Sequence, residues 1–264
     1  MLLTQAYLWH TVTCNGKEVV PISKMFRRHI GILALRFVLL AAAVTLWTTD
    51  KEGQGFTDML HRGFNGVFLW VVWAVMVAGM LLRLAPNKRI AIGARKHYGS
   101  SYHAAHLAQG ANEPVGMIAK RNRLHKGAIT SAIAWIVFNA VVFIMFSLKD
   151  LLTPMMTMIL MLFYSVCDMV CILIFCPFKV FFLSNRCCVD CRIHNWDYLM
   201  MCTPLILFPS LYSLSLLLLS AAVVLRWELA LWRNPNYFMS ETNENLRCER
   251  CSDRLCMLHD PLEK

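Results

Sequence analysis

Three stretches of this chain continue for 19, 22 and 28 residues without a charged side chain, and their length limits the fold more than any other feature. They are Phe64–Leu82, Gly127–Leu148 and Tyr198–Leu225. A helix of about 20 apolar residues crosses a hydrocarbon core roughly 30 Å thick. Two further runs, Ile30–Trp47 and Leu151–Phe175, carry one charge each. Because lipid offers no hydrogen-bond partner to an open strand, we expect an all-α integral membrane protein with about five transmembrane or membrane-embedded helices.

The composition supports the membrane class. Of the 264 residues, 58% are hydrophobic and 16% are charged, whereas soluble domains carry about 25% charged residues. A cleavable signal peptide is the alternative for the first run, because Arg27 and Arg28 precede it and Ala41, Ala42 and Ala43 resemble a cleavage site. The 29 residues before the run are too many for such a leader. We therefore expect an uncleaved first helix.

The distribution of lysine and arginine predicts the orientation, because these residues concentrate in cytoplasmic loops. Segment 1–29 contains four of them, and segment 83–126 contains nine beside a single acid, Glu113. We therefore expect a cell-membrane protein with its N-terminus, the basic loop 83–126 and a cysteine-rich loop 185–197 in the cytoplasm. The lipid bilayer and its anionic headgroups are the expected partners. Nucleic acid is not expected, because aromatic residues are sparse in the basic loop.

The sequence divides into three parts. They are a cytoplasmic N-terminal segment 1–29, a membrane helical domain 30–227 and a cysteine-containing tail 228–264. Within the first part, Asn15 and Gly16 lie between two short extended stretches, which is typical of a β-hairpin turn.

Two cysteine clusters flank the last apolar run. In each cluster the C-x-x-C spacing lets two thiolates of one turn bind the same ion, and two such pairs complete a tetrahedral shell. We expect one such site with the ligands Cys188, Cys191, Cys248 and Cys251. The alternate ligands are Cys187, Cys256 and His259. Zinc is the expected ion, with iron or an iron–sulfur cluster as the alternative. A disulfide framework is less expected, because the cytoplasm keeps thiols reduced.

One ion can join the two clusters only if both lie on the same side of the membrane. A single crossing by Tyr198–Leu225 would instead produce separate sites on opposite faces. Pro204 and Pro209 break the first half of this run, and two arginines follow it closely. We therefore expect a half-membrane arm 197–208 and a fuller arm 210–227 that returns the chain to the cytoplasmic side.

Arg36 and Asp168 are the only charges well inside the apolar runs. Each lies about 9 to 10 Å from the cytoplasmic end of its run, at 1.5 Å per residue. Matching depth and opposite sign predict an ion pair, because a lone charge in lipid is expensive. The alternative for Arg36 is that its long side chain reaches out to the membrane interface.

Two other groups of residues are expected to have structural roles. Cys167, Cys171 and Cys176 lie in or just after the fourth run, where cysteine typically packs as a small hydrophobic residue. Asn195, Trp196 and Asp197 follow the first cysteine cluster and are typical of an interfacial anchor.

The sequence leaves three functions open and contains no HExxH, Walker A, GxSxG or GxGxxG motif. The first is a non-enzymatic multi-pass membrane protein in which structural zinc joins loop 185–197 to the tail. The second is a membrane redox or electron-transfer protein in which the same cysteines hold iron. The third is a transporter or lipid-handling enzyme that uses the proline-broken segment 198–227 and Asp168.

Overall fold

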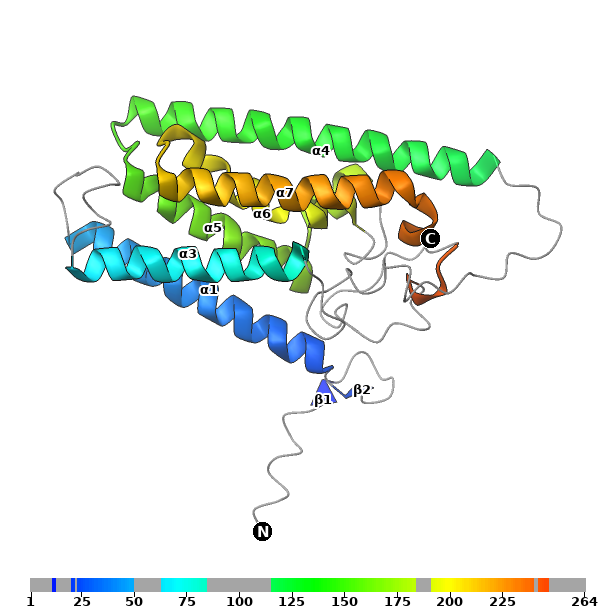
Figure 1. The fold of residues 1–264 in the computed structure, drawn as a ribbon, viewed down its shortest axis with the longest axis horizontal. Helices are drawn as coiled ribbons and strands as arrows, with labels where there is room; N and C mark the ends of the chain where they lie inside the picture. Colours follow the sequence, from blue (N-terminus) through cyan, green and yellow to red (C-terminus); the bar gives the residue numbers. More distant parts are fainter. Residues whose placement is uncertain are drawn as a thin grey trace, which may run out of the picture.

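In the computed structural model, the chain forms a bundle of long helices (Figure 1). The structure describes residues 11–12, 20–21, 23–49, 63–84, 115–183, 191–239 and 242–246. Five helices in these ranges are long and apolar enough to cross a membrane, which confirms the predicted helical membrane class. They are α1 (Lys24–Thr49), α3 (Gly63–Leu84), α4 (Val115–Leu148), α5 (Pro154–Leu173) and α7 (Leu211–Arg233).

Shorter elements complete the described chain. Strands β1 (Thr11–Val12) and β2 (Val20–Pro21) pair antiparallel, as the hairpin prediction requires, whereas Asn15 and Gly16 lie outside the described residues. Six short helical elements follow α5 in the described chain: η2 (Phe178–Leu183), η4 (Arg192–Asn195), α6 (Asp197–Cys202), η5 (Thr203–Leu207), η6 (Pro235–Phe238) and η7 (Glu244–Leu246).

Polar caps fix where α5 and α7 begin. The Thr153 hydroxyl accepts a hydrogen bond from the Met156 backbone N–H at 3.2 Å. Pro154 occupies the first turn of α5, where a backbone N–H has no helical partner to lose. Ser210 and Ser213 form a reciprocal capping box at the start of α7. These caps explain why the chain reverses at two points within strongly apolar sequence.

The last apolar run folds as a hairpin and not as one crossing. Its first arm consists of α6 and η5, and three residues separate this arm from α7. Pro204 lies in the first turn of η5, and Pro209 lies just before α7. Because neither proline can donate a backbone hydrogen bond, a continuous helix cannot pass through this region.

Contacts with α3 show how far the first arm reaches. Asp197 at its start pairs with Arg83 near the end of α3, and Tyr212 just after the arm donates its hydroxyl to the Leu69 carbonyl at 3.0 Å. The 14 residues of α3 from Leu69 to Arg83 correspond to about 21 Å of helix axis. The turn that joins the arm to α7 therefore lies about 21 Å from Arg83 along α3, and the 3₁₀ turns of η5, which rise about 2.0 Å per residue, add to the length of the arm.

Helix α7 returns to the end of the bundle from which the arm starts. Glu228 accepts hydrogen bonds from Arg192 Nε at 2.9 Å and from Trp196 Nε1 at 2.7 Å, and both donors lie just before α6. Figure 1 shows α1 beginning and α3 ending at this same end, which we call the basic end and which carries Lys24 and Arg83. The predicted return of the chain is present.

Helix α5 is the most buried of the long helices and α4 is the most exposed. In the most apolar window of each helix, 67% of the residues are buried in α5 and 11% in α4. Helix α5 packs on α1 and on the broken arm, whereas α4 packs mainly on η2. The exposed side chains of α4 are apolar, for example Ile133, Ile136 and Val141. They form a surface suited to lipid.

Candidate functional site: a buried charge network between two cavities

The predicted ion pair between Arg36 of α1 and Asp168 of α5 is present in the structure. Arg36 Nη1 lies 2.8 Å from Asp168 Oδ2, and the two side chains are 10% and 13% exposed. The same nitrogen donates to the Ser165 carbonyl at 2.5 Å. Arg36 therefore points into the bundle and pairs there with a carboxylate, so its side chain does not reach out to the interface.

A second ion pair, which the sequence analysis missed, joins Arg83 of α3 to Asp197 of α6. Arg83 Nη2 lies 2.5 Å from Asp197 Oδ2, and the side chains are 11% and 4% exposed. Arg83 Nη1 also donates to the His194 carbonyl at 2.9 Å, and the Tyr198 backbone N–H donates to Asp197 Oδ1 at 2.8 Å. Asp197 is therefore a buried partner of Arg83, a role that the sequence analysis did not predict.

Tyr198 lies against α3 at a position where only glycine fits. The Arg83 guanidinium lies 5.6 Å from the centroid of the Tyr198 ring, within the range of a cation–π contact. A Cβ atom on Gly79 would lie 2.0 Å from the Tyr198 hydroxyl oxygen. The absence of a side chain at Gly79 thus permits the approach that brings Asp197 to Arg83.

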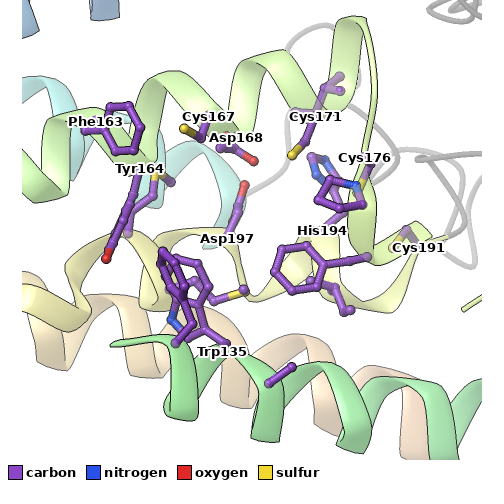
Figure 2. Close-up of a pocket in the computed structure, with 18 residues that line it drawn as sticks. Trp135, Phe163, Tyr164, Cys167, Asp168, Cys171, Cys176, Cys191, His194 and Asp197 are labelled. Carbon is purple, nitrogen blue, oxygen red and sulfur yellow. The ribbon is translucent and has the colours of Figure 1, made fainter. Parts of the chain in front are cut away.

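Three side chains of metal-ligand type converge at the centre of this network (Figure 2). Ligand atoms of Asp168, His194 and Asp197 all lie within 4.8 Å of one another. These residues are the group of the described chain that could hold a divalent cation. Their charge balance argues against it, because Arg36 and Arg83 already neutralise the two carboxylates and a buried cation would add two uncompensated charges. The arrangement is better suited to an ion-pair network.

The carboxylate side of this network faces a cavity of about 420 Å³. Figure 2 shows Asp168 and Asp197 directed toward one another beside aromatic side chains that include Trp135 and Tyr164. Phe163 also lines the cavity and is 48% exposed on the surface of the bundle. We call this space the α4–α5 cavity, because its walls come mainly from these two helices.

Four cysteines line the α4–α5 cavity: Cys167, Cys171, Cys176 and Cys191. The side chains of Cys171 and Cys176 interact with one another. The sequence placed the first three among buried small residues, and the structure agrees that they are partly buried. The spacing of these cysteines along the helix does not predict that they line a cavity, because the cavity forms only where α4 packs at a distance from α5.

The arginine side of the network faces a second cavity, of about 320 Å³, between α1 and α3. Arg36 and Arg83 both line it, together with Arg28 and His29. We call this space the α1–α3 cavity. Each ion pair thus separates the two spaces, with its guanidinium on one side and its carboxylate on the other.

One of the seven predicted metal ligands, Cys191, lies within the described chain. It is buried and packs with Ala128, Leu183 and Ile193 near the basic end. The other six predicted ligands lie outside the described residues: Cys187, Cys188, Cys248, Cys251, Cys256 and His259. Their convergence on one ion stays a prediction.

The segments next to the two cysteine clusters both pack near the basic end of the bundle. Arg192 and Trp196, which follow Cys191, bind Glu228 in the last turns of that helix. Further along, Leu246 packs against Phe26, Ile172 and other residues at the basic ends of α1 and α5. The chain on both sides of the proposed metal site therefore lies at one end of the bundle.

Comparison of the chain with protein-family models, with curated proteins and with solved structures gives no match.

Proposed function

We propose that this chain is a multi-pass membrane protein in which one structural zinc ion closes the basic end. The proposed ligands are Cys188, Cys191, Cys248 and Cys251, with Cys187, Cys256 and His259 as alternates. The observation that supports this proposal is the hairpin formed by α6, η5 and α7, which returns the chain to the end that carries Cys191. The zinc ion joins loop 185–197 to the tail and limits the movement of both.

The packing of Leu246 adds a distance argument. Ile172 contacts the same small core as Leu246, and Ile172 also lines the α4–α5 cavity together with Cys191. Cys248 follows Leu246 by two residues, a reach of about 7 Å for extended chain. Leu246, which precedes Cys248 by two residues in the sequence, therefore packs at the same end of the bundle as Cys191.

Elemental analysis of the purified full-length protein tests the proposal. We expect about one zinc per chain and a colourless solution; bound iron and a visible spectrum would instead support the redox alternative with the same cysteines. Cys191→Ser and Cys251→Ser should each reduce bound metal at least tenfold, because a structural site needs its closed shell. Cys167→Ser is the matched control and should retain the metal. Full metal content in both test variants would contradict the proposal.

We also propose that the basic end faces the cytoplasm, with the N-terminus and loop 185–197 on that side of the cell membrane. The excess of lysine and arginine at this end supports the orientation. Impermeant thiol reagents should not label a cysteine introduced at Gly93 in intact cells. Labelling from outside would reverse the assignment.

A second candidate function, as a transporter or lipid-handling enzyme, is supported by the α4–α5 cavity. The broken segment 198–227 contributes Met200 and Met201 to its lining, and Asp168 lies at its polar side. A lipid with a photoactivatable acyl end should label Tyr164, which is 5% exposed and is reached only through the cavity. Ala134→Trp should reduce this labelling severalfold, because Ala134 lines the cavity. Labelling confined to the outer surface of the helices would contradict this function.

A further inference from the structure

The α1–α3 cavity has a shape that fits a lipid entering from the side. Helix α1 packs mainly on α5 and α3 packs mainly on α7. Figure 1 shows the two helices diverging toward the basic end. The cavity between them is about 320 Å³, and Leu35 and Leu82 in its lining are 46% and 37% exposed on the outer surface. The space is therefore open toward the region that surrounds the bundle in a membrane.

Three arginines and a histidine belong to the lining of this cavity. Arg28, His29, Arg36 and Arg83 all contribute to it, and no aspartate or glutamate occurs among the described residues that line it. The two aspartates that pair with Arg36 and Arg83 line the α4–α5 cavity on the other side. Because these aspartates neutralise Arg36 and Arg83, the lining offers an anion guanidinium N–H donors and, among its described residues, no opposing carboxylate.

The buried arginines retain N–H groups for a ligand. A guanidinium carries five N–H donors. Within the described part of the chain, the hydrogen bonds of Arg36 all start from Nη1, and those of Arg83 use Nη1 and Nη2 once each. Since both side chains are only about one-tenth exposed, a phosphate bound here would be largely shielded from water. Charge-assisted hydrogen bonds from arginine to phosphate are among the strong ones.

Beyond Arg36, which lies one turn before Leu39, the lining of the cavity is apolar. Leu39 of α1 and Val72 and Met76 of α3 line it. Leu39 lies 11 residues beyond Arg28, or about 16 Å along the helix, which is roughly half of a 30 Å hydrocarbon core. A molecule with its anionic group near Arg28 would therefore place an apolar chain along these side chains.

We propose that the α1–α3 cavity binds an anionic phospholipid, with the phosphate near Arg28, His29 and Arg83 and an acyl chain against Leu39 and Met76. The arginines then serve two partners, a carboxylate inside the bundle and a phosphate at the lipid side. This proposal does not rest on the proposed zinc ion, because none of the predicted metal ligands is among the described residues that line the cavity.

Lipid binding to the delipidated full-length protein, followed by native mass spectrometry in neutral detergent, tests the proposal. The probes are phosphatidylglycerol, phosphatidylcholine with the same acyl chains, and inorganic phosphate as competitor. We expect phosphatidylglycerol to bind at least tenfold more tightly than phosphatidylcholine, with inorganic phosphate unable to displace it at equal concentration. Equal binding of the two lipids, or displacement by inorganic phosphate, would overturn the proposal.

Paired variants distinguish a site from general attraction to the charged surface. Arg28→Gln should weaken phosphatidylglycerol binding about fivefold, the effect of one cation near a membrane surface. Arg27→Gln removes the same charge from the neighbouring exposed residue, which does not line the cavity, and should change binding less than twofold. Equal effects of the two variants would contradict the site.

A second pair tests the apolar part without changing charge. Ala78→Trp should fill the cavity and reduce lipid binding severalfold, whereas Ala74→Trp, one turn away and outside the lining, should not. A thermal melt of each variant checks that it is folded. Unchanged binding in a folded Ala78→Trp protein would contradict an acyl chain between α1 and α3.

Discussion

The two cavities differ in the charge that faces them, although the same two ion pairs border both. Asp168 and Asp197 line the α4–α5 cavity together with thiols and aromatic rings, whereas Arg36 and Arg83 line the α1–α3 cavity. Each pair is neutral as a unit, so burying it in a membrane bundle costs less free energy than burying a single charge. Because the partners of each pair face different cavities, one side of α5 and α6 presents hydrogen-bond acceptors and the other side presents donors.

This difference shows that a buried ion pair does more than cancel charge. A guanidinium has donors to spare after it binds one carboxylate, and a carboxylate has spare acceptor sites. The α1–α3 cavity can therefore accept an anion, and the α4–α5 cavity can accept a hydrogen-bond donor. Loss of one partner should affect the two cavities unequally, and three sets of substitutions test this network in order of expected effect.

The largest effect should come from Asp168→Ala. It leaves the buried Arg36 guanidinium without its carboxylate, and unpairing one member of a buried pair typically costs about 3 to 5 kcal/mol. Chemical unfolding in detergent micelles measures the loss. The double variant Arg36→Met with Asp168→Leu should recover most of it, because it removes both charges. Additive damage in the double variant would show that the two residues are not coupled.

An intermediate effect should come from Gly79→Ala in α3. The new Cβ atom would lie 2.0 Å from the Tyr198 hydroxyl, so the buried Tyr198 ring or the two helices must shift, at a cost of about 1 to 3 kcal/mol. Gly31→Ala in α1 is the matched control, because no heavy atom lies within 4 Å of its Cβ position. The control should be neutral or stabilising by up to about 1 kcal/mol, since alanine favours the helix. Equal melting temperatures for the two variants would contradict this close approach.

The sequence predicted one of the two ion pairs, and the reason lies in where the charges occur. Arg36 and Asp168 interrupt apolar runs at matching depth, which is a signal that sequence carries. Arg83 and Asp197 lie at the ends of such runs, where positive-inside bias and interfacial anchoring account for them equally well. Arg83 directly follows one apolar run and Asp197 directly precedes another, and both lie at the basic end. This shared position is the signal that could have indicated the pair.

The prolines predicted the return of the chain, but not how far the first arm reaches. Pro204 and Pro209 indicate a break, whereas the length of the arm depends on the mixture of α and 3₁₀ turns that packing against α3 selects. The two cavities could not be predicted at all. They arise from the way the helices pair. Helix α1 packs mainly on α5 rather than on α3, and α4 packs mainly on η2 rather than on α5.

The smallest effect should come from Tyr164→Phe at the wall of the α4–α5 cavity. The Tyr164 hydroxyl donates to Asn139 Oδ1 at 3.1 Å, and both residues are buried. Phenylalanine keeps the edge-to-face contact with Trp135, whose ring centroid lies 4.8 Å away, so the variant isolates the hydrogen bond. Hydrogen bonds between membrane helices contribute about 0.6 kcal/mol on average and up to about 1.7. We expect a loss in that range from unfolding in micelles.

The double variant Asn139→Leu with Tyr164→Phe sharpens the same test. It removes donor and acceptor together, so no buried polar group is left without its partner and the stability should return toward that of the native protein. A coupling near zero in this cycle would show that the hydrogen bond does not hold α4 against α5. Helix α4 would then be held at this wall of the cavity by the ring contacts of Trp135 and by the hydrogen bond from Trp135 Nε1 to the Thr203 hydroxyl at 3.2 Å.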